Sequence, residues 1–155
     1  MSKIFLKVRP FRETAGYCGP ASLKILLSYY GVDKSEKQLA KLCKTKKDLG
    51  TSGENIKSAA EKLGFKVKIK DNSSFKDIES WLKMGAPVIV DWFTNDGHYS
   101  VAAGLDDKFI YLQDPELGRM RKLERKNFMT VWFDFKGKYI KPNELIIRQI
   151  IAIYK

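Results

Sequence analysis

The sequence predicts an α+β fold, in which helices from the first half of the chain pack on an antiparallel sheet formed by the second half. In the first half, apolar residues recur mostly at helical spacing, whereas residues 87–154 contain short apolar or alternating runs separated by turn-forming residues. This segregation of helices and strands is typical of α+β proteins and differs from the regular strand–helix alternation of a doubly wound parallel sheet.

Length and composition indicate one domain covering residues 1–155. The chain has 155 residues, of which 44% are hydrophobic and 30% charged, as in an ordinary globular protein. A chain of this length can bury a sizeable core without disulfides or metals. We find neither an internal repeat nor a low-complexity segment, so we expect a monomer with a single core.

Local signals give the order of elements in the first half. We expect a strand at 3–8, helices at 19–30, 35–43, 52–63 and 74–84, and a strand at 65–70. The first helix has Pro20 in its first turn and ends at Gly31. In the second helix, Ser35 and Gln38 have the spacing of a capping box.

The second half reads as strands. We expect a buried strand at 87–93, a hairpin of 98–103 and 108–113, a short helix or turn at 125–132, and strands at 138–140 and 146–154. Asp106 and Asp107 form the hairpin turn. The last strand is expected to pack back onto the sheet.

A cysteine begins the first helix in the segment YCGPASLKILLSYYG, residues 17–31. A thiol at a helix N-terminus lies near the positive end of the helix dipole and near unpaired backbone N–H groups. Both favour the thiolate, the nucleophilic form, and the same N–H groups can hold a developing oxyanion. A lone cysteine is also often a buried, inert residue, so Cys18 alone does not establish an active site.

The only histidine, His98, opens the predicted hairpin in GHYSVAAGLDDKFIYLQDPELG, residues 97–118. If the turn centres on Asp106 and Asp107, His98 lies opposite Asp114 or Pro115, with Cβ atoms about 5 Å apart. A carboxylate at that distance can orient an imidazole and fix its tautomer. The sequence therefore supplies a candidate nucleophile, base and orienting group.

These blocks, together with LGTSGENIKSAAEKLGFKVK, resemble the bacteriocin-processing cysteine peptidases, which cleave leader peptides after a double glycine and have a papain-like fold. The resemblance covers residues 8–135 approximately. It implies that Cys18 is the nucleophile, His98 the general base and acid, and Asp114 the orienting residue. If it extends to the substrate, the cleft is narrow and accepts glycine, with Trp92 and Tyr99 as candidate walls.

The sequence departs from this family at the oxyanion hole. The family usually has a glutamine six residues before the cysteine, where this chain has Arg12, followed by Glu13. Arg12 is the candidate donor by ungapped spacing, and Glu13 is the candidate if one residue is deleted. An ionised Glu13 would repel an oxyanion, and loss of one such donor costs about 100- to 1000-fold in turnover.

The formal net charge is +11, with basic clusters at 41–47, 119–126 and 136–141. Such a surface can attract polyanions, but no nucleic-acid-binding signature is present, and a solubilising lysine-rich surface is favoured. One histidine and two distant cysteines predict no metal site, and we expect no cofactor. The start of the chain does not resemble a signal peptide, and its apolar runs are too short to insert in a membrane.

The sequence thus favours a cytoplasmic cysteine peptidase acting on a peptide substrate, with a separate transporter as the candidate partner. A bridge between Cys18 and Cys43 would silence the nucleophile, and a reducing cytoplasm is the simpler setting. Two alternatives stay open. One is a catalytically impaired relative that binds leader-like peptides without cleaving them, and the other is an acyltransferase that uses the same triad.

Overall fold

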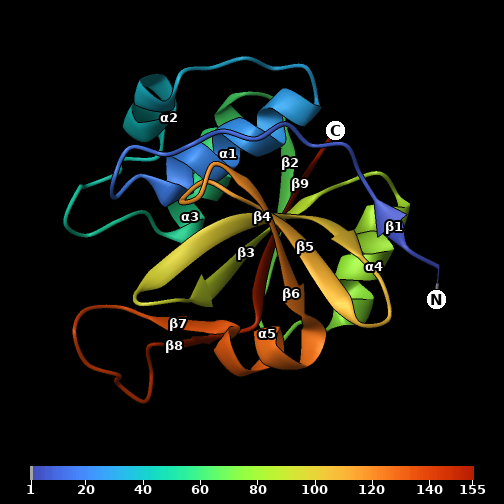
Figure 1. The fold of residues 1–155 in the computed structure, drawn as a ribbon. Coiled ribbons are helices and arrows are strands. Elements are labelled where there is room, and N and C mark those ends of the chain that lie inside the picture. Colours follow the sequence, from blue (N-terminus) through green and yellow to red (C-terminus); the bar gives the residue numbers. More distant parts are fainter. Residues whose placement is uncertain (1) are drawn as a thin grey trace.

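The computed structural model describes residues 2–155, which are organised around one antiparallel sheet (Figure 1). Its strands run in the order β2-β9-β3-β4-β5-β6, and β1 pairs with β4. The bounds are β1 Ile4–Phe5, β2 Lys66–Lys70, β3 Val88–Phe93, β4 Gly97–Leu105, β5 Phe109–Asp114, β6 Arg119–Glu124 and β9 Gln149–Tyr154. A separate two-stranded sheet joins β7 Phe133–Phe135 to β8 Leu145–Ile147.

Helices cover both faces of the main sheet (Figure 1). The first three helices, α1 Cys18–Tyr29, α2 Glu36–Leu42 and α3 Gly53–Lys62, pack on one face. The other two, α4 Phe75–Lys83 and α5 Arg125–Val131, pack on the opposite face. The α+β class is therefore confirmed, and the predicted helix layer is divided between the two sides of the sheet.

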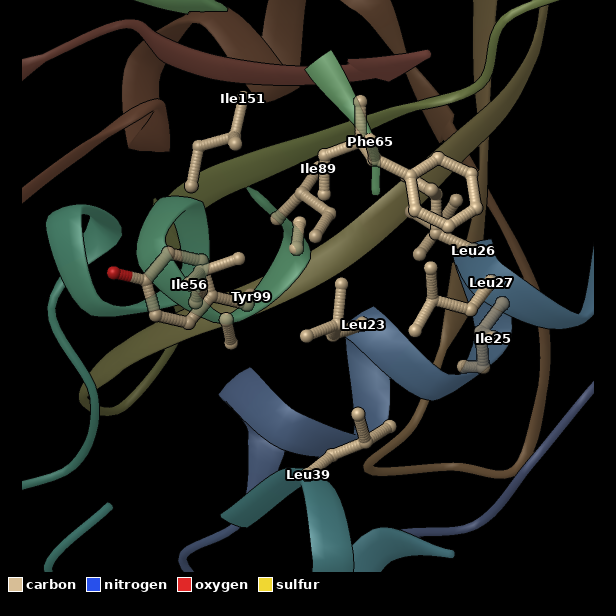
Figure 2. Close-up of a cluster of buried hydrophobic side chains, with 14 of the residues drawn as sticks. Leu23, Ile25, Leu26, Leu27, Leu39, Ile56, Phe65, Ile89, Tyr99 and Ile151 are labelled. Carbon is tan, nitrogen blue, oxygen red and sulfur yellow. The ribbon is translucent and has the colours of Figure 1, made fainter. Parts of the chain in front are cut away.

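A hydrophobic core packs under α1 and fixes the helix that begins with Cys18 (Figure 2). Leu23 and Leu27 of α1 are fully buried and belong to one cluster with Ile89 of β3 and Ile151 of β9. Burial of each such side chain stabilises the fold by roughly 2 kcal/mol. Because β9 lies between β2 and β3, the last strand of the chain completes the surface on which α1 rests, as expected.

Several expected elements need correction. The strand predicted at 3–8 is reduced to the two residues of β1, and the segment 138–140 is not a strand. Strands β6 and β7 were not predicted. In β6 four of six residues are charged, so the alternation that identifies a half-buried strand is weak, as is common at the edge of a sheet.

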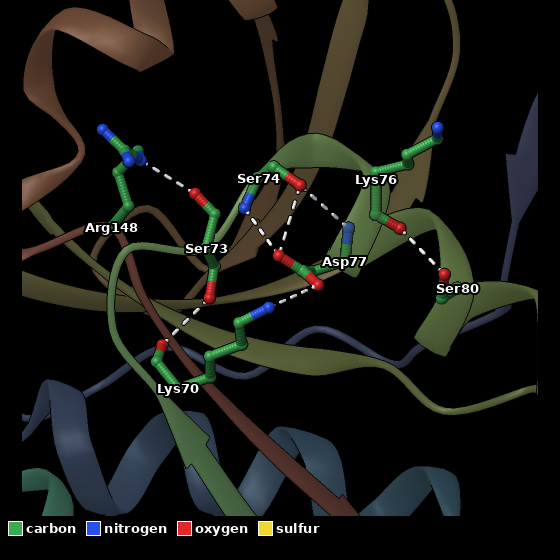
Figure 3. Close-up of polar contacts among 7 residues, drawn as sticks. All are labelled: Lys70, Ser73, Ser74, Lys76, Asp77, Ser80 and Arg148. Atoms are coloured by element: carbon green, nitrogen blue, oxygen red, sulfur yellow. Dashed lines mark hydrogen bonds and ion pairs between the residues drawn. The ribbon is translucent and has the colours of Figure 1, made fainter.

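The strand predicted at 146–154 is divided by Arg148, whose backbone lies in the left-handed region with φ of 47°. Its N–H donates to the carbonyl of Trp132, and its Nε donates to the carbonyl of Ser73 at 2.8 Å (Figure 3). These long-range bonds hold a conformation that the local sequence does not favour. The chain therefore leaves β8 and enters the main sheet as β9.

Helix caps are where local sequence and structure agree best. In α4 the Ser74 Oγ accepts from the Asp77 N–H at 3.3 Å, and Asp77 Oδ2 accepts from the Ser74 N–H at 2.8 Å (Figure 3). The capping box predicted at Ser35 and Gln38 is present in α2. The helix ends lie within one residue of the predicted bounds for α1 to α4, as the cap signals require.

We predict that Ser74→Ala lowers the free energy of unfolding by about 1 kcal/mol, because it leaves first-turn N–H groups of α4 without an acceptor. Urea unfolding followed by circular dichroism measures this loss. Ser80→Ala is the matched control, since Ser80 lies inside the same helix and donates only to the Lys76 carbonyl. Equal losses for both variants would show that the cap contributes nothing specific.

Candidate active site

Cys18 is the first residue of α1, and the residue after it, Gly19, has no room for a side chain. A Cβ added at Gly19 would lie 2.7 Å from Cβ of Thr51, so only glycine allows the loop to approach this turn. Pro20 has no N–H to leave unpaired. The Cys18 thiol is half-buried and is not joined in a disulfide, since Cys18 and Cys43 are both free. The predicted position of Cys18 at a helix start is confirmed.

His98 is the second residue of β4 and is bonded to the last residue of β5. Its Nε2 lies 2.6 Å from Oδ1 of Asp114, and both side chains are buried. The Asp114 Oδ1 also accepts from the Glu116 N–H at 3.0 Å. The Cys18 thiol also acts on the imidazole and helps to raise the pKa of His98. The imidazole thus interacts with both the carboxylate and the thiol.

The register of the hairpin differs from the predicted one. Leu105 pairs with Ile110, so the turn centres on Asp107 and Lys108 and not on Asp106 and Asp107. Beyond a shift between Ala102 and Gly104, Val101 pairs with Gln113, which extends to Ser100 opposite Asp114. His98 is thus a diagonal neighbour of Asp114, not a directly opposed residue. Diagonal pairs on one face remain within reach of long side chains, so the His98–Asp114 hydrogen bond forms although the predicted register was wrong.

The electrostatics of this pair favour a charged imidazole. Burial alone would lower the pKa of His98, but the hydrogen bonds with Asp114 and Cys18 outweigh it and raise the pKa to about 10. Burial alone would raise the pKa of Asp114, but the hydrogen bond with His98 and the charges around it hold the pKa below its usual range. His98 is therefore an imidazolium at neutral pH, beside a thiol that it can stabilise as a thiolate.

Two charged residues near the pair were missed by sequence reasoning. Arg121 of β6 lies 3.1 Å from Oδ2 of Asp114 and stacks over the Trp92 ring, with its guanidinium carbon 5.3 Å from the ring centroid. Glu116 lies 3.7 Å from the His98 Nε2. The only sequence signal for Arg121 is that it follows Asp114 across a tight turn, and the strand that places it was itself not predicted.

The segment before α1 is tied to the turn after β5. The Glu13 N–H donates to the Pro115 carbonyl at 2.8 Å, and Oε1 of Glu13 is buried and accepts no hydrogen bond from residues 2–155. Burial raises the pKa of Glu13 to about 7; His98 opposes this shift, and the carboxylates of Glu116, Asp114 and Glu36 add to it. Arg12 is instead exposed, and its Cβ and Cγ pack against Gly118. Of the two candidate donors, Glu13 is the one beside His98.

The two candidate wall residues have different surroundings. Trp92 meets His98 edge to face at a centroid distance of 5.7 Å, donates to Ser100 Oγ at 3.0 Å, and lines a groove of about 570 Å³ together with Arg121. Tyr99 belongs to the core under α1 (Figure 2), and its hydroxyl donates to the Thr51 carbonyl at 3.0 Å. Both residues are buried, but only Trp92 contacts His98, whereas Tyr99 belongs to the core cluster under α1.

One set of groups in the described part of the chain could share a cation. Ligand atoms of His98, Asp114 and Glu116 lie within 4.8 Å of one another. However, the 2.6 Å hydrogen bond with Asp114 uses the Nε2 that a cation would need. The arrangement fits a nucleophile, a base and an orienting carboxylate better than a metal site. Within residues 2–155, no helix has the length and apolar character needed to cross a membrane.

Comparison with known proteins gives one consistent result. Residues 12–136 match the Peptidase C39 family. Over 119 residues the chain is 33% identical to a lactococcin transport/processing ATP-binding protein LcnC-like from Lactococcus lactis, covering 74% of this chain and 16% of that protein. Over 114 residues it is 32% identical to an uncharacterized protein of Methanothermobacter marburgensis, covering 71% of this chain and 73% of that protein. The chain thus spans only a small part of its transport relatives.

Solved structures agree on the fold. The peptidase domain of Streptococcus ComA, a bi-functional ABC transporter involved in quorum sensing, superimposes with a TM-score of 0.75 at 24% identity, over 96% of this chain and 97% of that one. A double glycine motif protease from an AMS/PCAT transporter, solved in complex with the leader peptide, gives 0.72 at 24% identity, over 97% and 93%. At these identities the likeness concerns the fold alone.

We predict that iodoacetamide labels Cys18 much faster than Cys43 at pH 7, because burial raises the pKa of Cys43 to about 12 and the His98 imidazolium stabilises a thiolate at Cys18. Peptide mass mapping over a pH series measures both rates. His98→Ala should slow labelling of Cys18 below pH 8 and leave Cys43 unchanged. Equal rates at the two cysteines from pH 5 to 9 would contradict the pairing of Cys18 with His98.

Proposed function

The chain belongs to the peptidase C39 family, and on this premise we propose that it is a cysteine peptidase that cleaves a peptide bond with Cys18, His98 and Asp114. The observation that carries the proposal is the position of the His98 imidazole. It is bonded to Asp114 through Nε2 at 2.6 Å, and Cys18, the first residue of a helix, acts on it and helps to raise its pKa. A nucleophile, a base and a group that orients the base are the parts that covalent peptide cleavage requires.

In the first step, the Cys18 thiolate attacks the carbonyl carbon of the scissile bond. The carbonyl oxygen becomes an oxyanion, held by the unpaired N–H groups at the start of α1. The His98 imidazolium then gives its proton to the leaving nitrogen, the carbon–nitrogen bond breaks, and an acyl-thioester remains on Cys18. Asp114 keeps the imidazole in the required orientation and stabilises its charge.

In the second step, neutral His98 takes a proton from water, and the resulting hydroxide attacks the thioester. The bond between the carbonyl carbon and sulfur breaks, the acid product leaves, and the proton on His98 restores the starting ion pair. Because the pKa of His98 is raised to about 10, its positive charge in the resting site persists through neutral pH. The imidazolium that protonates the leaving nitrogen is thus present before the substrate arrives.

We further propose that the scissile bond follows two glycines of a leader peptide. A relative of this fold is described as a double glycine motif protease in complex with the leader peptide. In this chain, the turn around Cys18 is closed by Thr51, and Trp92 stands beside His98. A site with such walls discriminates against larger residues by steric clash as well as by contact. A transporter that delivers the peptide is the proposed partner, since the lactococcin relatives are transport and processing proteins.

We predict that a synthetic peptide containing a Gly-Gly pair is cut after the second glycine, and that Cys18→Ala abolishes the cut. His98→Ala should reduce kcat/KM by about 10²- to 10⁴-fold, since proton transfer contributes that much. Mass spectrometry of the products measures both. Tyr139→Ala is the control, because Tyr139 is 79% exposed on the loop between β7 and β8. Equal cleavage after Gly-Gly and after Leu-Lys would refute the glycine specificity.

A second candidate function is peptide binding without efficient cleavage. The observation that favours it is Glu13, a carboxyl group beside His98 where a family glutamine would donate to the oxyanion. With its pKa raised to about 7, Glu13 can donate only below that pH and repels an oxyanion above it. A peptide that binds but is cut very slowly at pH 8 would support this second function.

We predict that Glu13→Gln raises kcat several-fold at pH 8 and removes a fall in activity centred near pH 7, because the amide donates at every pH. The pH profiles of kcat for the wild type and Glu13→Gln give the comparison. Arg12→Ala should leave both profiles unchanged, since Arg12 is exposed and packs on Gly118. If Arg12→Ala abolishes activity while Glu13→Gln changes nothing, Arg12 is the donor and the assignment to Glu13 is wrong.

A further inference from the structure

A group of acceptor atoms without donors lies beside the proposed nucleophile. Asp91 of β3 is 1% exposed, and no donor in residues 2–155 pairs with either oxygen of its carboxyl. Its side chain meets the carboxyl of Asp134 in β7, and the charge of Cys18 acts on it. Burying a carboxyl is costly unless it is paired, so this arrangement requires a proton or a cation between the two carboxyls.

A neighbouring amide points to the same requirement. Gln149 of β9 is directly opposite Asp91 in the β3–β9 register, so the two side chains share one face of the sheet. Gln149 is 8% exposed, and its Nε2 donates to Asp71 Oδ1 at 2.9 Å, whereas its buried Oε1 has no donor within residues 2–155. An orphaned amide oxygen next to an orphaned carboxylate indicates a ligand that brings several N–H donors.

Close backbone approaches connect this group to the active site. A Cβ at Gly97 would clash with the carboxylate of Asp134, so the Asp134 side chain lies directly on the residue before His98. A Cβ at Gly53 would lie 2.9 Å from the Gln149 Oε1. The two glycines leave room for these oxygens, and Asp134, which is only partly buried, lies nearer the surface than Asp91.

No positive charge within residues 2–155 balances the carboxyl pair, since neither residue takes part in an ion pair with a lysine or arginine. Burial raises the pKa of Asp91, and the contact with Asp134 and the charges of Cys18 and Asp71 raise it further. These effects disfavour two bare charges at this place, which a cation between the carboxyls relieves.

We propose that Asp91, Asp134 and the Gln149 carbonyl form a subsite beside Cys18 that binds a cationic group of the peptide substrate, a lysine ammonium or an arginine guanidinium. The inference rests on the proposed function, because it takes the substrate to be a peptide that reaches Cys18. An ammonium or guanidinium supplies only donors, which the Asp91 oxygens and the Gln149 Oε1 lack, whereas Asp134 Oδ1 already accepts from the Phe135 N–H at 2.7 Å. Carboxylates in a partly buried site make charge-assisted hydrogen bonds with such groups, which are stronger than neutral ones.

Thiol-directed reagents of opposite charge test the subsite without requiring a cleaved substrate. The Cys18 thiolate attacks the sulfenyl sulfur of a methanethiosulfonate, which forms a mixed disulfide and releases methanesulfinate. The ethylammonium reagent should modify Cys18 about tenfold faster than the ethylsulfonate reagent, after each rate is divided by that with a small free thiol. The net charge of +11 favours the anionic reagent, so a preference for the cation reports local charge.

Asp91→Asn and Asp134→Asn should each lower this rate ratio several-fold, because the amide keeps the shape and removes the charge. Asp96→Asn is the matched control, since it removes an exposed carboxylate near Asp134. Cys18→Ser gives the background from Cys43. A ratio that is the same in wild type, Asp91→Asn and Asp134→Asn overturns the subsite.

Paired peptides then test recognition of the substrate. Gly-Gly peptides with lysine or norleucine scanned along the flanking positions should differ several-fold in kcat/KM at one position, and Asp91→Asn should remove the difference. If lysine and norleucine peptides are cut equally at every position, recognition of a cationic residue is wrong while the peptidase proposal stands. If no peptide is cut, the peptidase proposal fails, and the reagent ratios alone decide whether the subsite exists.

Discussion

The site depends on the buried hydrogen bond between His98 and Asp114. Two ionisable groups removed from water are stable there only as a pair, since either one alone would carry an uncompensated cost. The sheet meets this condition, because β4, β5 and β6 are neighbours. β4 supplies the imidazole, the end of β5 supplies the carboxylate, and Arg121 of β6 neutralises its second oxygen. Helix α1 then adds only the Cys18 thiol to an imidazole that the sheet already orients.

Sequence reasoning succeeded where the determining signals are local. Ser35 caps a helix through atoms a few residues away, and Pro20 and Gly31 limit α1 in the same way, so these ends can be read from the chain. The hairpin that carries His98 was identified from its turn. Its register was not, because two adjacent aspartates do not fix which residues form the turn, and the structure centres it one residue later, on Asp107 and Lys108. The interruption of the last strand at Arg148 could not be predicted either, because carbonyl groups far away in the sequence hold this residue in a left-handed conformation.

The same distinction applies to the site. Cys18, His98 and Asp114 lie in recognisable blocks, so the sequence could name them, although their roles still await the experiments above. Asp91 and Gln149 could not be named, because nothing in their own segments indicates a site. They meet only because β9 is inserted beside β3, and Asp134 joins them from β7, which was not predicted. The acidic surroundings of Cys18 are also hidden by a net charge of +11, which the lysines on outer elements dominate.

Carboxyl groups in this site have opposite requirements for protons. Glu13 helps an oxyanion only when it is protonated, whereas Asp91 and Asp134 attract a cation only when they are ionised. Burial raises the pKa of Glu13 to about 7 and also raises that of Asp91, so without substrate both groups hold a proton to a higher pH than an exposed carboxyl does. A cationic group bound at the proposed subsite would separate the two, because it would lower the pKa of Asp91 directly, while Glu13 lies beside His98 and is tied to Pro115. Substrate binding can therefore ionise Asp91 and Asp134 and leave Glu13 protonated. A change of pH alone could not do this, because it shifts the protonation of all three carboxyls in the same direction.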